Sequence, residues 1–112
     1  MLIVHHTHLP CEASPGARTS TVADRSGDIS AFEVRLIELD PGARLPPSVH
    51  AGEMAVLALA GQGKLHLASG SQRFAAPCSL FIPPHAPYQI LNSASTALQL
   101  VMVCTEAPRL SP

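Results

Sequence analysis

Histidine, glutamate and tyrosine side chains in two short stretches are those whose types could carry chemistry. The stretch PPSVHAGEMAV contains His50 and Glu53. Further along the chain, PPHAPY contains His85 and Tyr88. Imidazole and carboxylate groups suit first-row divalent metals as ligands, and an imidazole that titrates near neutral pH can also move protons. The residue types therefore point to metal binding, or to acid–base chemistry with His50 as the base and Tyr88 as the acid.

Short strands must hold these stretches in place. The segment 31–39 alternates, so that Val34 and Leu36 oppose Arg35 and Ile37, and a DPGA turn ends it. No segment shows a sustained apolar period of 3.6 residues, which argues against helices. Many short strands between turn signals predict an all-β sandwich or barrel.

The apolar run at 52–63 is interpreted as a buried strand. Prolines precede it and glycines end it, and this favours a strand over a helix. Because the run is apolar on both faces, we expect both faces to be buried. The remaining strands are expected within 20–28, 64–71, 79–87, 88–93 and 97–105.

Length and composition indicate one globular domain. The 112 residues are 46% hydrophobic and 13% charged, which excludes disorder for most of the chain. We assign 1–112 to a single domain with a core at roughly 18–106. Residues 1–17 form an extended N-terminal segment in this assignment, and 107–112 form a loose tail.

Charge and cysteine usage narrow the partners and the compartment. The formal net charge is −1 and no basic cluster occurs, so neither nucleic acid nor a membrane surface is expected as a partner. The three cysteines are widely spaced without a CxxC pair, which indicates free thiols in a reducing compartment. No signal peptide or membrane helix is recognised. A cytoplasmic protein is predicted.

The run GARLPPSVHAGEMAVLALAG resembles the first motif of the cupin family, G-x5-H-x-H-x3-E-x6-G. Gly42, His50 and Gly61 match that motif. Ser48 stands in place of its first histidine, and Met54 stands in place of its glutamate. The two glycines of the motif are thus present, and most of its metal ligands are not.

The run PCSLFIPPHAPYQILN resembles the second cupin motif, G-x5-P-x-G-x2-H-x3-N. Pro83 and Asn92 match it. Pro77 and His85 replace its two glycines, and Tyr88 replaces its ligand histidine. Because both motifs occur in order at the expected separation, the chain resembles a small, single-domain, RmlC-like cupin with degenerate metal-binding motifs.

The resemblance implies a double-stranded β-helix barrel of jelly-roll type. In metal-dependent cupins three histidines and a glutamate hold one divalent ion, and His50 is the single one of the four that remains. We therefore expect no cofactor. The alternative is a divalent transition metal on a non-standard set with His50 and Glu53, which needs a β-bulge to turn Glu53 inward. Pleat parity opposes this, since a one-residue slip turns over the whole following strand.

The four family ligand positions, as they stand here, imply a pocket for a small molecule. Ser48, His50, Met54 and Tyr88 would give a mostly apolar wall with a few orienting polar groups. His85 would lie at its mouth, because the loop that holds it borders the cavity in this family.

Three functions remain open at this stage. The first is binding of a small organic molecule in a metal-free barrel, with catalysis undecided. The second is a metal-dependent enzyme of dioxygenase or isomerase type. The third is a non-catalytic dimeric scaffold. A homodimer is expected, because the apolar composition leaves surface for a partner subunit and cupins are often dimers.

Overall fold

The computed structural model describes residues 3–23 and 32–105. A single-turn 3-10 helix, η1 (His6–His8), precedes the strands. The helix is one turn long, so no helix in the described part of the chain could cross a membrane. The strands are β1 (Glu12–Ser14), β2 (Ala17–Ala23), β3 (Phe32–Leu39), β4 (Met54–Ala60), β5 (Gln62–Leu67), β6 (Gly70–Ala75), β7 (Cys78–Ile82), β8 (Tyr88–Leu91) and β9 (Leu98–Thr105).

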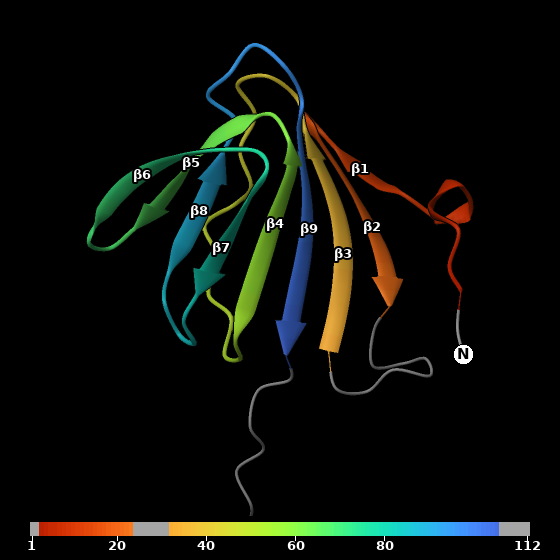
Figure 1. Cartoon of the computed structure of the whole chain (residues 1–112), viewed down its shortest axis with the longest axis horizontal. Helices are drawn as coiled ribbons and strands as arrows, with labels where there is room; N and C mark the ends of the chain where they lie inside the picture. The colour runs from red at the N-terminus through yellow and green to blue at the C-terminus, as the bar shows by residue number, and fades with distance from the viewer. Residues whose placement is uncertain (1–2, 24–31, 106–112) are drawn as a thin grey trace, which may run out of the picture.

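The described strands form two antiparallel sheets. The larger has the order β1-β2-β3-β9-β4-β7, and the smaller has the order β6-β5-β8. Figure 1 shows β6, β5 and β8 on the β7 side of the large sheet. The lower end of that view contains the starts of β3, β4 and β8 and the ends of β2, β7 and β9. The prediction of an all-β fold is confirmed.

The expected strands correspond to observed ones, but β6 was not predicted, because the SGS turn at 69–71 was taken as the end of a strand and not as the start of another. Other differences lie at the ends of the chain. The segment 9–17, expected as extended loop, contains β1, which pairs with β2. The SGD turn predicted at 26–28 and the tail at 107–112 lie outside the described residues. The three cysteines are unpaired, as the sequence predicts.

The strand β4 is buried on one face, so the prediction that both faces are buried was wrong. Met54, Val56 and Ala58 point into the core, whereas Leu57 and Leu59 are 37% and 57% exposed. Apolar composition alone does not distinguish a strand between two layers from a strand whose outer face is apolar and uncovered. The outer face of the large sheet therefore exposes apolar side chains to solvent.

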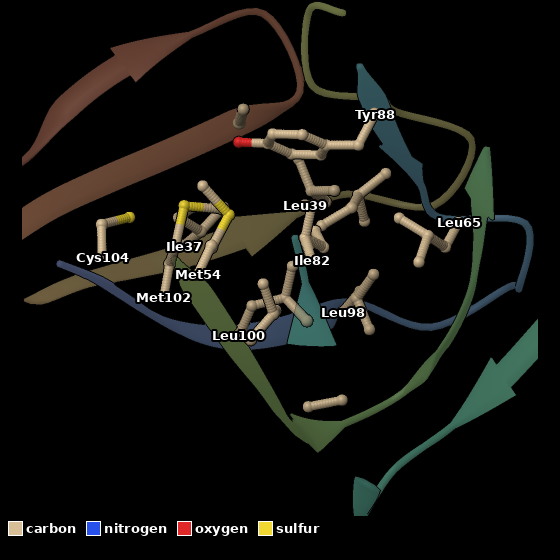
Figure 2. Packing of buried hydrophobic residues seen from close by; sticks show 14 residues of the cluster. Ile37, Leu39, Met54, Leu65, Ile82, Tyr88, Leu98, Leu100, Met102 and Cys104 are labelled. Carbon is tan, nitrogen blue, oxygen red and sulfur yellow. The ribbon is translucent and has the colours of Figure 1, made fainter. Parts of the chain in front are cut away.

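The core lies between the inner faces of the two sheets. Leu39 ends β3, Leu98 begins β9 and Ile90 lies one residue before the end of β8, and all three are 0% exposed. These ends of β3, β8 and β9 are at the top of Figure 1, and we call this end of the barrel the closed end. Burying one such side chain stabilises the fold by roughly 1.5–3 kcal/mol. Figure 2 shows the phenol ring of Tyr88 lying over this cluster, with its oxygen on the side of Ile37 and away from Leu65.

One asparagine and one glycine complete the closed end. Asn92 is 1% exposed. Its Nδ2 donates to the carbonyl oxygens of Leu39 at 3.0 Å and Thr96 at 2.8 Å. Gly61, with φ of +97°, lies where the chain crosses from β4 to β5. A Cβ there would lie 2.5 Å from the Ala97 oxygen, so a larger residue would force the backbone apart. These two motif residues therefore have structural roles.

Candidate functional site

A cavity of about 350 Å³ opens between the β1–β3 edge of the large sheet and the segment 45–48. Ile37 of β3 and Met102 of β9 form its apolar floor, and Leu45 covers the opposite side. Its polar lining consists of Arg35, Tyr88, Ser48, Thr19 and the strand β1, whose Glu12 stands at the exposed rim. A small concave site with an apolar wall and a few polar groups has the usual profile of a binding pocket for a small molecule.

Backbone pairing places Ser48 and Tyr88 side by side at the cavity. The two residues form an isolated antiparallel bridge, and each backbone N–H donates to the other's carbonyl oxygen at 2.9 Å. The hydroxyl of Ser48 donates to the Pro46 oxygen at 2.9 Å, so its own lone pairs remain able to accept a hydrogen bond. The bridge fixes one wall of the cavity independently of any ligand.

The phenol of Tyr88 is held in its neutral form. Tyr88 is 8% exposed, and this burial raises its pKa above the ordinary value of 10.0. The nearby thiol of Cys104 adds to the increase in pKa, while Ser48 and Arg35 oppose it. A tyrosine of ordinary pKa is already protonated at neutral pH, so Tyr88 has a proton that it can donate to a ligand oxygen, and burial keeps it protonated to a higher pH.

Arg35 brings a positive charge to the inner face of β3. It shares that face with Ile37 and Leu39, because alternate residues of a strand point the same way. Its Nε and Nη2 both donate to one oxygen of Glu33, at 3.1 Å and 2.9 Å. The pair is partly exposed, with 45% of the Arg35 side chain and 20% of the Glu33 side chain accessible. The guanidinium is thus present at the cavity without being fully enclosed.

His50 is oriented away from the cavity, toward the end of β9. Its Nε2 lies 2.9 Å from the carbonyl oxygen of Thr105. Because a carbonyl oxygen can only accept, Nε2 carries the proton in this arrangement. Gly52 packs against the same place, where an added Cβ would lie 2.4 Å from the Thr105 oxygen. The histidine thus fastens the 46–53 turn onto β9.

The residues around His50 do not make a set of metal ligands. Glu53 is exposed, and its backbone rather than its carboxylate is bound, with the N–H donating to Thr105 Oγ1 at 2.9 Å. Met54 follows in regular pairing with Cys104, without the bulge that would turn Glu53 inward. Throughout residues 3–23 and 32–105, no three His, Cys, Asp or Glu side chains gather around one point. The donor set therefore does not fit the divalent ion of metal-dependent cupins.

The five predicted ligand-binding residues separate into two groups. Ser48 and Tyr88 line the cavity, and Met54, His50 and His85 do not. Met54 is buried in the core, where Figure 2 shows its sulfur beside that of Met102. His85 lies in an exposed turn at φ of 63°, and its backbone N–H donates to the His50 oxygen at 2.8 Å. Their roles in binding or catalysis stay predictions, and the base His50 and the acid Tyr88 are not brought together at the cavity.

Sequence reasoning found Ser48 and Tyr88 but missed the other residues that line the cavity, and Arg35 is the positively charged one among them. The alternation at 31–39 predicts two faces but does not say which one points inward, because both carry apolar residues. The structure decides this through Leu39, the last residue of the strand, which is fully buried. Counting back from Leu39 in steps of two places Ile37, Arg35 and Glu33 on the inner face.

Comparison with solved structures shows which known proteins share this fold. The chain is similar to the polyketide cyclase RemF from Streptomyces resistomycificus, with 20% identity, 97% of this chain and 82% of that chain covered, and a TM-score of 0.83. It is similar to a predicted oxalate decarboxylase from Thermotoga maritima, with 18% identity, 93% and 98% covered, and a TM-score of 0.82. An RmlC-like cupin from Shewanella frigidimarina follows, with 16% identity, 94% and 90% covered, and a TM-score of 0.77.

Sequence comparison gives the same placement. A search of curated proteins found no significant match. A family model described as a cupin domain matches residues 35–104, which include both motifs and every strand from the middle of β3 to β9. The predicted double-stranded β-helix barrel is confirmed by the structural likeness. The chain therefore belongs to the cupin family and has an RmlC-like fold.

Proposed function

We propose that this cupin binds a small organic molecule in the cavity beside Tyr88, without a metal ion. The observation that carries the proposal is the cavity of about 350 Å³. It has room for a compact ligand, and it combines an apolar floor of Ile37 and Met102 with the hydroxyl of Tyr88. The structural neighbours include a polyketide cyclase and a predicted oxalate decarboxylase, whose names indicate work on small organic molecules.

Metal-independent binding is supported by the residues at the family ligand positions. Ser48 and Tyr88 are joined through their backbones, and Met54 is packed in the core. His50 is engaged with Thr105 through Nε2. None of these arrangements requires an ion to hold the barrel together, so chelation should not weaken ligand binding. The cytoplasmic location rests on the three unpaired cysteines and stays a prediction.

Tyrosine fluorescence can report ligand binding in this protein without an added label. Tyr88 is the single tyrosine and the chain has no tryptophan, so the intrinsic fluorescence belongs almost entirely to the cavity. A panel of non-absorbing organic acids, amides and sugars is titrated while this fluorescence and the melting temperature are followed, with and without a strong chelator. Binding that changes both signals and survives the chelator supports the proposal. Loss of binding with the chelator would support the metal-dependent enzyme instead.

A dimeric scaffold is the second candidate, and the outer face of the large sheet favours it. Two rows of cross-strand neighbours run over β3, β9, β4 and β7. One row consists of Leu36, Val101 and Leu57, and the other of Val34, Val103, Ala55 and Phe81. Phe81 is 78% exposed. A continuous apolar face of this kind marks an interaction site, and we propose that a second copy of the chain covers it.

The two candidates are compatible and are tested separately. Sedimentation equilibrium of the wild type is compared with a variant carrying Leu57→Glu, which places a charge at the β4 end of one apolar row, next to Val101. A Ser69→Glu variant is the matched control, because Ser69 lies in the exposed β5–β6 turn. A wild-type dimer that Leu57→Glu separates, and Ser69→Glu leaves intact, supports assembly through this face. A monomeric wild type at high concentration would exclude it.

A further inference from the structure

We propose that Arg35 makes the cavity selective for organic monoacids, whose single carboxylate pairs with the guanidinium while an apolar body lies on Ile37 and Met102. This inference rests on the proposed binding function and adds the chemical class of the ligand. Arg35 and the two apolar residues all line the same cavity. Arg35 also pairs directly with Met102 across the β3–β9 ladder, so the charge and the apolar floor are neighbours.

The hydrogen bonds of Arg35 leave part of its guanidinium available. Both of its bonds go to Oε1 of Glu33, from Nε at 3.1 Å and from Nη2 at 2.9 Å. Within residues 3–23 and 32–105, Nη1 has no hydrogen-bond partner. Guanidinium groups bind carboxylates through two parallel N–H donors. A ligand carboxylate can therefore use the open Nη1 edge, or displace the partly exposed Glu33.

Groups opposite Arg35 supply the rest of the recognition. The neutral phenol of Tyr88 offers an O–H to a ligand oxygen, beside the N–H donors of Arg35. The hydroxyl of Ser48 has its proton bound to the Pro46 oxygen, so it can only accept and does not contribute to binding a carboxylate. A carboxylate would thus meet two kinds of donor in one cavity, whereas a sugar would find an apolar floor under its hydroxyls. This combination favours an acid over a polyol.

The carboxylate of Glu12 at the rim limits the ligand to one carboxylate group. Glu12 lines the same cavity as Arg35 and is exposed. With Glu33 beside Arg35, the nearby formal charges are one positive and two negative. A second carboxylate on the ligand would meet Glu12 without a cation to neutralise it. The cavity is therefore expected to reject diacids.

The test compares probes of nearly equal shape and different charge. Cyclohexanecarboxylate is titrated against cyclohexanecarboxamide and trans-1,4-cyclohexanedicarboxylate, and Tyr88 fluorescence and calorimetry follow binding. None of these probes absorbs where tyrosine is excited. The monoacid is expected to bind about tenfold more tightly than the amide, the lower end of what a charge-assisted hydrogen bond contributes. The preference should shrink as salt is raised, because the pair is partly exposed.

Variants of the ion pair make the test specific. Arg35→Gln should remove the preference for the acid, and Arg35→Lys should keep part of it, since lysine has the charge without the fork. Glu33→Gln should tighten acid binding by freeing the guanidinium. Arg73→Gln is the control with the same change in charge, because Arg73 is exposed on β6, in the other sheet. It should bind like the wild type, and melting temperatures verify that each variant folds.

The outcomes separate this inference from the function on which it rests. Equal binding of acid and amide, unaffected by Arg35→Gln, would overturn the role of Arg35 and leave the binding function standing. Equal loss of acid binding in Arg35→Gln and Arg73→Gln would show a general effect of net charge, and would also overturn it. If no probe and no member of the wider panel binds, both the inference and the proposed function fail.

Discussion

The two ends of the barrel differ in how tightly their side chains are packed and in how many of their polar groups are hydrogen-bonded. At the closed end Leu39, Ile90 and Leu98 are 0% exposed, and the side chain of Asn92 makes three hydrogen bonds. At the cavity side about 350 Å³ remains open, and Arg35 keeps an edge of its guanidinium unbonded within the described residues. The closed end has the properties of a structural core, and the cavity side has those of a site.

Five motif positions follow this difference, whereas the kept His50 does not, because it lies at the end of β9, bonded to Thr105. Gly61 and Asn92 match the family motifs, and both lie at the closed end with clear steric or hydrogen-bonding reasons. Ser48, Met54 and Tyr88 replace the family's metal ligands and lie toward the other end. The same barrel can therefore keep its packing signals while its interior chemistry changes.

The largest expected effect is on packing, and it compares Leu39 with Leu45. Leu39→Ala empties a fully buried site at the closed end and should lower the free energy of unfolding by about 2–5 kcal/mol. Leu45→Ala enlarges a cavity that is already open, so its cost should be less than half as large. Urea denaturation of both variants measures the difference. Equal losses would show that the cavity side is packed as tightly as the closed end.

The next effect concerns the buried polar group of the closed end. Asn92→Ala leaves the carbonyl oxygens of Leu39 and Thr96 without their donor, so a loss of about 2–3 kcal/mol is expected. Gln89→Ala is the comparison, because Gln89 Nε2 makes a single, partly buried bond to the Leu45 oxygen at 3.0 Å. Its cost should be about 1 kcal/mol. Denaturation curves in which Asn92→Ala is no worse than Gln89→Ala would contradict the structural role of Asn92.

A smaller effect tests whether His50 belongs to the fold or to the site. His50→Ala removes the bond to the Thr105 oxygen and should cost about 1 kcal/mol without changing probe affinity in the cavity. His85→Asn is the control, since His85 is exposed and asparagine tolerates its φ of 63°. Thermal unfolding and probe titration are measured on both. If the His50→Ala variant kept its full stability but no longer bound the probe, His50 would have a role in ligand binding and not in the fold.

Sequence reasoning reached the fold more completely than the site, for a physical reason. Strand alternation and turn residues act locally, so β3, β5, β8 and β9 could be placed from short stretches of sequence. The orientation of a side chain at a strand end depends on what packs beside it. His50 bonds to Thr105, 55 residues further along the chain, and no spacing rule predicts that contact.

The exposed faces were equally hard to predict. Leu57 and Arg35 are the two instructive cases, because an apolar residue faces outward and a charged one faces the cavity. Hydrophobic patterning assumes that apolar residues point to the core of one chain. A partner subunit on the outer face and a charged ligand in the cavity are the two conditions under which that assumption fails. Both conditions are proposed here for this cupin, on independent observations.

The smallest effect is spectroscopic and concerns the ionisation of Tyr88 itself. Burial raises the pKa of its phenol above the ordinary 10.0. Absorbance near 295 nm should therefore show ionisation above pH 10 in the native protein and near pH 10 in urea. Because the unfolded chain loses this proton first, the stability that neutral Tyr88 contributes is complete below the unfolded pKa and is lost as the pH rises through the folded one. Tyr88 is the single tyrosine, so the signal needs no assignment.

The direction of change in two variants then locates the phenol relative to its neighbours. Arg35→Gln should move the ionisation of Tyr88 to higher pH, because the guanidinium lowers the pKa, and Cys104→Ala should move it to lower pH. Shifts in these opposite directions would place Tyr88 between the cation of the cavity and the thiol of the core. If Arg35→Gln left the titration of Tyr88 unchanged, the two groups would not share one electrostatic environment, and the position of the phenol beside the cation of the cavity would be contradicted.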